Sequence, residues 1–128
     1  MTLESLRTDI DKLDARILAL LDERMEKALL TRRHKKDTLD SSRESAVLER
    51  VARRSRGLAD AGLTSQLYTL IMARSKAVQE RKPLLIGFQG MHGAYSDMAA
   101  KAWAADSATI PFREFSQVFD AVMAGDTD

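Results

Sequence analysis

The chain contains no cysteine, so disulfide bonds and zinc sites built on thiolates are excluded. It also lacks a long uninterrupted apolar segment, and three acidic residues, Glu4, Asp9 and Asp11, lie among its first apolar positions. Neither a signal peptide nor a membrane-spanning helix fits that pattern. These absences predict a soluble, cytoplasmic protein that has no membrane contact.

A surplus of charge of either sign is absent as well. Lys and Arg total 20 and Asp and Glu total 19 among 128 residues, which leaves no general positive surface for a polyanion such as a nucleic acid. Any binding site for an anion must therefore be local.

Helical periodicity fills the first half of the chain. Apolar residues recur at steps of three and four from Leu3 onward, which marks one face of a helix, and no glycine or proline interrupts the pattern before Lys36. The sequence therefore predicts a helix of about 34 residues, roughly 50 Å long. The apolar face of this helix is formed by Leu6, Ile10, Leu13, Ile17 and Leu20.

Two further helices are predicted before the first proline. A Ser-Ser-Arg-Glu sequence resembles a capping box and predicts a second helix from Ser41 to Gly57. A third helix is predicted over residues 63–81, between Gly62 and Pro83. Its expected inner face consists of Leu67, Leu70, Ile71 and Val78.

After Pro83 the pattern changes to that of an α/β fold. Strands are predicted over residues 84–88 and 108–112, and helices over residues 94–105 and 116–124. Two strands are too few for an independently stable core, so we expect this part to be poorly ordered or to rest on the helical part. Its aromatic residues, Trp103, Phe112, Phe115 and Phe119, are predicted to be core positions.

The apolar face of the first helix continues into cations. Arg24 follows Leu20 by four residues, and Lys35 lies eleven residues further, only about 20° around the helix. A charge that faces a core is costly unless it is paired, and the nearby sequence offers more cations than acids. An anionic ligand would resolve this imbalance. For either residue alone, the simpler interpretation is a long side chain that reaches past the core into water.

Arg7 lies on the same predicted helix, nearer the N-terminus. It lies 17 residues before Arg24, about 25 Å along the helix axis, so the two cannot hold one small molecule from a single chain. If they share a ligand, Arg7 must come from another copy. The alternative is a local ion pair with Asp11, four residues on.

The other two predicted helices also carry polar residues in suggestive places. Asp40, Arg43 and Glu44 cluster where the second helix begins, although N-capping by Asp40 or Ser41 and complementing the helix dipole explain such residues equally simply. Ser75 and Gln79 lie four residues apart on the third helix, where a solvated polar edge is the default interpretation.

Taken together, these positions resemble the all-helical class of chorismate mutases, especially the mutase domains that begin bifunctional mutase–prephenate dehydratase proteins. The resemblance covers residues 6 to 79 and depends on the order and spacing of the segments rather than on one motif. The segments are Leu6-Arg7 through Ile10, Leu13-Asp14, Leu20-Leu21 to Glu23-Arg24, Lys35, Asp40-Ser41-Ser42-Arg43-Glu44, and Ser75 with Gln79.

The second half resembles the opening of a prephenate dehydratase domain, through Ile86-Gly87-Phe88-Gln89-Gly90, Gly93-Ala94-Tyr95-Ser96 and Ala99-Ala100. The implied fold is all-α over residues 1–82, a three-helix mutase domain that forms an intertwined homodimer, followed by an incomplete α/β segment over residues 83–128. That segment lacks the Thr-Arg-Phe sequence that the dehydratase family uses, so no dehydratase activity is expected. The connection before Asp40 is shorter than in the best-known mutases, which leaves Lys36 as an alternative to Lys35.

The resemblance implies the rearrangement of chorismate, a dianion, to prephenate in phenylalanine and tyrosine biosynthesis, with no cofactor and no metal. Such a reaction needs a site that holds the compact conformer and stabilises negative charge on the breaking ether oxygen. Eight residues are implied: Arg24 and a second copy's Arg7 for the carboxylates, Lys35 and Gln79 as donors to the ether oxygen, Glu44 as acceptor from the ring hydroxyl, and Asp40, Arg43 and Ser75 to orient and close the site.

Two other functions remain open at this point. An isochorismate-pyruvate lyase has a similar cationic pocket, and its product, pyruvate, distinguishes it from a mutase. A non-catalytic helical module would use the basic run over residues 32–36 to bind acidic partners or RNA, but stacking aromatic residues are absent nearby. Salt-sensitive RNA binding without turnover of chorismate would favour that module.

Overall fold

The computed structural model describes residues 1–35 and 40–128. Three helices come first, and a small segment with two strands follows, which confirms the predicted order of elements. The elements are α1 (Leu3–Arg32), α2 (Ser41–Arg54), α3 (Ala61–Glu80), β1 (Leu85–Gln89), α4 (Tyr95–Trp103), β2 (Ala108–Phe112) and α5 (Phe115–Ala124). Residues 83–128 are called the α/β segment below.

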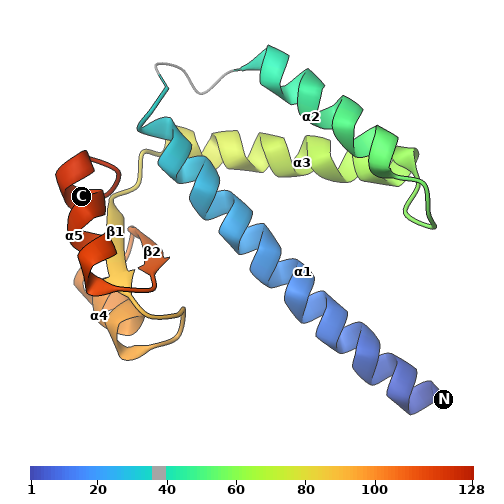
Figure 1. Ribbon diagram of the computed structural model, residues 1–128, viewed down its shortest axis with the longest axis horizontal. Coiled ribbons are helices and arrows are strands. Elements are labelled where there is room, and N and C mark those ends of the chain that lie inside the picture. Colours follow the sequence, from blue (N-terminus) through green and yellow to red (C-terminus); the bar gives the residue numbers. More distant parts are fainter. Residues whose placement is uncertain (36–39) are drawn as a thin grey trace.

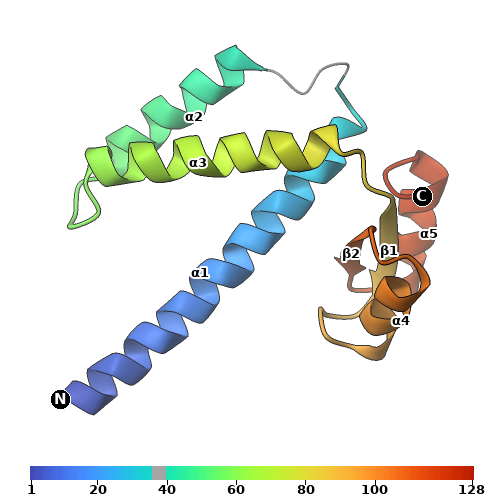
Figure 2. The same ribbon diagram turned by 180° about the vertical axis from the view of Figure 1, so that it is seen from behind.

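The three helices form an open arrangement. In both views α2 and α3 lie side by side as an antiparallel hairpin, and α1 crosses α3 close to the C-terminal ends of both helices (Figures 1 and 2). The N-terminal part of α1 extends away from the hairpin. Its apolar face is consequently exposed, from 44% at Leu6 to 62% at Leu20. A single copy therefore leaves an apolar helix face without cover.

The end of α1 differs from the prediction. The helix stops at Arg32 rather than reaching Lys36, and a tight turn follows in which the amides of Arg33 and His34 donate to carbonyls three residues back, at 3.1 and 3.0 Å. The side chains on this turn contact the α/β segment: Arg33 pairs with Asp128. The two residues that follow the helix, Arg33 and His34, thus bind carboxylates that lie far away in the sequence.

The start of α2 also corrects one prediction. Asp40 is the N-cap, and its side chain accepts a hydrogen bond from the amide of Arg43 at 2.9 Å. Ser41 is therefore not the N-cap, so Glu44 does not complete a capping box with it, and the Glu44 carboxylate pairs with Lys76 on α3. The helix ends at Arg54, before the Gly57 that was predicted to end it.

The buried face of α3 only partly matches the prediction. Leu67 and Leu70, expected inside, are 45% and 56% exposed, whereas Met72, Ser75 and Gln79 are buried. The α3 side facing α1 and α2 is thus rich in polar groups. Buried polar groups are costly unless they find partners, so this face is a candidate for a site.

The α/β segment rests on the helices. This was one of two expectations from the sequence, the other being that the segment is poorly ordered. Its two strands pair in parallel, with Leu85 opposite Ala108 and Gln89 opposite Phe112. Leu85 and Ile110 of this sheet form one buried cluster with Leu29 of α1. Because the cluster draws on both halves of the chain, the small sheet obtains a core that two strands alone do not supply.

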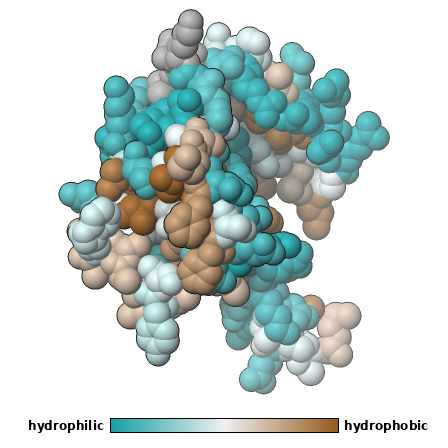
Figure 3. All heavy atoms as spheres, turned by 60° about the vertical axis from the view of Figure 1, so that its left-hand side comes forward, coloured by the Kyte–Doolittle hydropathy of each residue, from teal (hydrophilic) through white to brown (hydrophobic). Residues whose placement is uncertain are grey.

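The outer surface of the α/β segment is apolar. Trp103, Phe115 and Phe119 are 76%, 67% and 70% exposed, so the prediction that they are core residues is wrong; only Phe112 packs partly against the buried cluster. Figure 3 shows the side of the molecule where this segment lies, with apolar side chains gathered on it.

Polar contacts also tie the segment to α1. His92, in the loop after β1, contacts Glu26, and the Nε2 atom of His34 lies 2.8 Å from Asp126. The pKa of Asp128 is lowered from 3.8, because its carboxylate accepts the amide of Leu85 and lies beside Arg33, and these effects outweigh the burial that would raise it. The contact between the two halves is therefore both apolar and charged.

Within the described ranges, no helix combines the length and the apolar character that crossing a bilayer would need.

Candidate functional site

A small pocket of about 110 Å³ opens between the three helices, where α1 crosses the α2–α3 hairpin. Seven of the eight residues singled out from the sequence line it, and Arg7 is the exception. The lining residues are Arg24, Ala28, Thr31, Lys35, Asp40, Arg43, Glu44, Val47, Met72, Ser75, Lys76 and Gln79. We call this the central pocket.

Arg24 enters the central pocket from α1 and is held by α3. Its Nη1 atom donates to the hydroxyl of Ser75 at 3.4 Å, and its guanidinium lies 5.8 Å from the ring centre of Tyr68. Ser75 is buried, and its hydroxyl donates to the carbonyl of Ile71 at 2.9 Å. These contacts orient a half-buried cation without neutralising it.

Gln79 is the most deeply placed polar residue of the pocket, with 3% of its surface exposed. Its Nε2 atom donates to the carbonyl of Ala28 and lies 3.4 Å from the hydroxyl of Thr31, both on α1. The backbone carbonyl of Gln79 accepts from Arg32 at 3.3 Å. The crossing of α1 and α3 thus fixes the amide in place.

Lys35 reaches the rim of the pocket from beyond the end of α1. Its side chain is exposed, and the helical angle that predicted its direction does not apply because the helix has already ended. It nevertheless lines the same pocket as Arg24. Lys36, the alternative to Lys35, lies outside the described residues.

The sequence did not single out Lys76, which also lines the pocket. Its Nζ atom lies 2.7 Å from Oε1 of Glu44, and both side chains are 30% exposed. The available signal was positional: Lys76 directly follows Ser75 and precedes Gln79 by three residues, so it shares their side of α3. A lysine on a helix surface is so common that this spacing alone carries little information.

The lining of the central pocket has an excess of positive charge. Arg24, Lys35, Arg43 and Lys76 face two carboxylates, those of Asp40 and Glu44, which leaves an excess of two. Among residues 1–35 and 40–128, Lys76 is the pocket cation that pairs with a carboxylate within 4 Å, and the other three form no such pair. A dianion of matching size would balance this charge.

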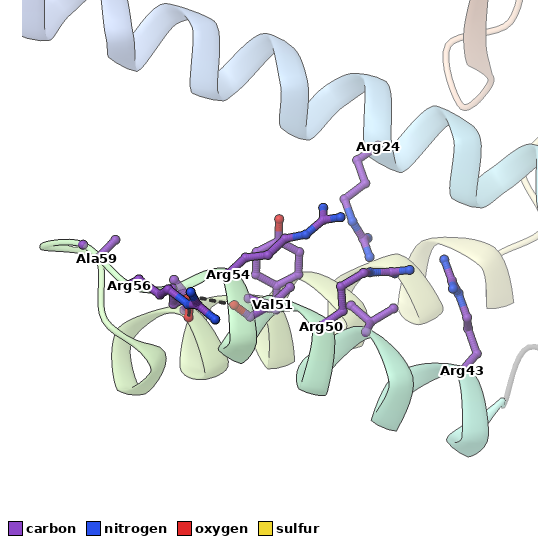
Figure 4. A pocket seen from close by; sticks show the side chains of 12 residues that line it. Arg24, Arg43, Arg50, Val51, Arg54, Arg56 and Ala59 are labelled. Atoms are coloured by element: carbon purple, nitrogen blue, oxygen red, sulfur yellow. Dashed lines mark hydrogen bonds between the residues drawn. The ribbon is translucent and has the colours of Figure 1, made fainter.

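A larger pocket of about 590 Å³ adjoins the central pocket and shares Arg24, Arg43 and Val47 with it. Five arginines line it and no carboxylate does; they are Arg24, Arg43, Arg50, Arg54 and Arg56. In Figure 4 the guanidinium groups of Arg24, Arg43 and Arg50 turn into the same space between α1 and α2. We call this the arginine pocket.

Arg7 lies apart from both pockets. It is exposed on the N-terminal part of α1, about 25 Å from Arg24 along the helix axis. No ion pair joins it to Asp11 in the part of the chain that the structure describes, so the local alternative is not what occurs. One copy of the chain leaves this arginine without a ligand site.

No group of three or more acidic or histidine residues gathers in a way that could hold a metal ion, as far as the described ranges extend.

Comparison with known proteins identifies the helical part. A family model described as chorismate mutase type II matches residues 6–80. The bifunctional chorismate mutase/prephenate dehydratase of Pseudomonas aeruginosa is 29% identical over 133 aligned positions, which cover 96% of this chain but 36% of that protein. The chain thus spans about a third of the length of this relative. No solved structure matches the chain.

Proposed function

Because the chain belongs to the chorismate mutase type II family, we propose that it rearranges chorismate to prephenate in the central pocket. The observation that carries the proposal is the excess of two positive charges in a pocket lined by seven of the eight residues that the family resemblance implies. Cations that gather around one pocket repel one another, and a bound dianion would offset that repulsion.

The proposed reaction needs no nucleophile. Chorismate rearranges within one molecule, and negative charge develops on the ether oxygen as its bond breaks. The enzyme therefore accelerates the step by holding the compact conformer and by placing donors at that oxygen. Arg24 is proposed to bind one carboxylate, since Ser75 and Tyr68 already fix its direction.

Lys35 and Gln79 are proposed as the donors to the ether oxygen. The Nε2 atom of Gln79 carries two hydrogens, and the hydrogen bond to the carbonyl of Ala28 uses one of them. The second is available once a ligand displaces the long contact to Thr31. Lys35 would add the positive charge, and its exposed position on the rim lets its flexible side chain close over the bound dianion.

Three further residues at the start of α2 are proposed to complete the site. Glu44 accepts from the ring hydroxyl of chorismate, and Arg43 closes the pocket beside the carboxylates. Asp40 acts more indirectly: its side chain caps α2 at the amide of Arg43, so it fixes where the helix and its arginine begin.

A second copy is proposed to complete the site with its Arg7, in an intertwined dimer. The exposed apolar face of α1 supports this, because several leucine and isoleucine side chains on one helix are otherwise in water. The arginine pocket supports it too, since it is large, adjoins the central pocket and has no acid of its own. The N-terminal part of a second copy's α1, with Glu4, Asp9 and Asp11, offers that pocket both carboxylates and an apolar face.

We assign residues 1–82 to the mutase unit and residues 83–128 to a dehydratase-like unit. The family match over residues 6–80 supports the first boundary. The two units would not be independent, because Leu29 of α1 shares a buried cluster with Leu85 and Ile110.

The experiment that tests the proposed function follows the loss of chorismate and identifies the product, on a sample whose oligomeric state is measured in parallel. We expect one prephenate for each chorismate consumed. Pyruvate from isochorismate would instead identify a lyase on the same fold. No turnover of either compound, together with salt-sensitive RNA binding, would leave the helical interaction module as the function.

A further inference from the structure

The pair of Lys76 and Glu44 differs from the other charged contacts of the central pocket. The Nζ–Oε1 distance is 2.7 Å, and among the described residues this is the ion pair that joins α2 to α3. Both side chains are only 30% exposed, so solvent screens the pair less than a surface pair. It therefore fixes the direction of the Glu44 carboxylate within the pocket.

Glu44 needs such a restraint because of its neighbours. Arg24, Arg43 and Lys35 line the same pocket, and each would attract a mobile carboxylate. A Glu44 side chain that turned to one of them would occupy the place of a substrate carboxylate. Lys76 binds Oε1 and so leaves Oε2 as an acceptor for a ligand.

We infer that Lys76 is a positioning residue of the site, which holds Glu44 for the ring hydroxyl of the substrate and away from the cations that bind its carboxylates. This inference rests on the proposed function and adds to it a residue that the family resemblance did not supply. Lys76 acts through Glu44 and does not itself touch the reacting atoms.

The kinetic consequence is specific. The ring hydroxyl takes no part in the bonds that form and break, so its contact with Glu44 is equally strong in the bound substrate and in the transition state. An interaction of that kind lowers KM and leaves kcat nearly unchanged. Loss of the Lys76 contact should therefore raise KM, in contrast to loss of a donor to the ether oxygen, which lowers kcat.

The test compares Lys76→Met, which keeps the length of the side chain, with Lys76→Arg, which keeps the charge. We expect Lys76→Met to raise KM by roughly tenfold with kcat within about twofold of the wild type, and Lys76→Arg to restore most of the loss. Arg74→Gln is the matched control, since it removes an exposed cation from the same helix outside the pocket and should leave both constants unchanged. Thermal unfolding of each variant is recorded alongside.

Two further measurements distinguish a positioning role of Lys76 from a purely structural one. The double variant Glu44→Gln/Lys76→Met should be no worse than Glu44→Gln alone, because Lys76 acts through Glu44. With a chorismate analogue that lacks the ring hydroxyl, wild type and Lys76→Met should behave alike.

An unchanged KM in Lys76→Met, or additive losses in the double variant, would overturn the inference. A lower unfolding temperature with unchanged kinetic constants would overturn the inference as well. That result would mean that Lys76 only stabilises the contact between α2 and α3. A wild type that makes no prephenate would instead refute the proposed function, and the inference with it.

Discussion

The guanidinium of Arg24 on α1 donates to the hydroxyl of Ser75 on α3 at 3.4 Å, across 51 positions of sequence. The contact lies where the two helices cross, and it directs a cation into the central pocket. Because Ser75 is buried, the contact also fixes the spacing of the two helices at the site.

Ser75→Ala should therefore have a larger effect on kcat/KM than on the free energy of unfolding. A hydrogen bond to a charged group contributes about 1.5–3 kcal/mol, and at 3.4 Å we expect the lower figure, or roughly a tenfold loss of kcat/KM. Thr69→Ala is the matched control, because its hydroxyl also donates to a carbonyl four residues back on α3 but meets no cation. Equal losses of kcat/KM in the two variants would show that the Ser75 hydroxyl stabilises helix α3 and does not act through Arg24.

Lys35→Ala should lower kcat while the protein stays folded. Removing one donor to a developing oxyanion typically costs about 2.7–4 kcal/mol, which corresponds to roughly a hundredfold to a thousandfold in rate. Circular dichroism and rapid measurement of chorismate loss check the two parts of this prediction. Lys36→Ala is the control: if it loses the activity and Lys35→Ala keeps it, the lysine assignment moves by one residue.

Gln79→Glu should introduce a dependence on pH that the wild type lacks. The amide donates at every pH, whereas a carboxyl group donates only when it is protonated. The variant should be slow at neutral pH and should gain activity as the pH falls through the carboxylate range. A wild type whose own rate rises in the same way, or a variant with a flat profile, would argue against Gln79 as a donor.

The contact between α1 and the α/β segment should weaken in acid. The pKa of Asp128 is lowered in the folded chain by the amide of Leu85 and by Arg33. A carboxylate with a lowered folded pKa stabilises the fold above its ordinary value of 3.8, and that stability disappears as the pH falls through the folded pKa. Unfolding in urea from pH 6 to pH 2.5 should thus show a decline that begins near pH 4.

Asp128→Asn should flatten part of that decline and lower the stability at neutral pH. Asp9→Asn is its control, because Asp9 pairs with Lys12 at 3.4 Å on an exposed face, where a pair contributes little. If the two variants have the same pH dependence as the wild type, the Asp128 contact does not stabilise the folded chain.

The order of elements could be predicted because it is encoded locally. Glycine, proline and apolar periodicity mark each element of the α/β segment within two residues of where the structure has it. The contacts of the turn after α1 could not, since its partners Asp126 and Asp128 lie more than ninety positions away in the sequence. The same holds for His92, whose partner Glu26 lies 66 positions away.

The candidate site likewise has residues that could be predicted from the sequence and residues that could not. Arg24, Ser75 and Gln79 could be placed from helix spacing and family resemblance, because the crossing of α1 and α3 keeps their register. The role of Lys76 depends on how α2 lies against α3, which no spacing along a single helix predicts. Similarly, the exposure of Phe115 and Phe119 depends on what packs on α5, not on their own chemistry.

In the proposed dimer, one copy supplies Lys35 and the other supplies Arg7 to the same site. Arg7→Ala and Lys35→Ala should each be nearly inactive, whereas co-expression of the two should restore activity. Random pairing makes half of the dimers mixed, and one of the two sites in each mixed dimer carries neither substitution. We predict about a quarter of the wild-type rate of prephenate formation from the co-expressed pair. A mixture no more active than the two variants measured separately would contradict the shared site.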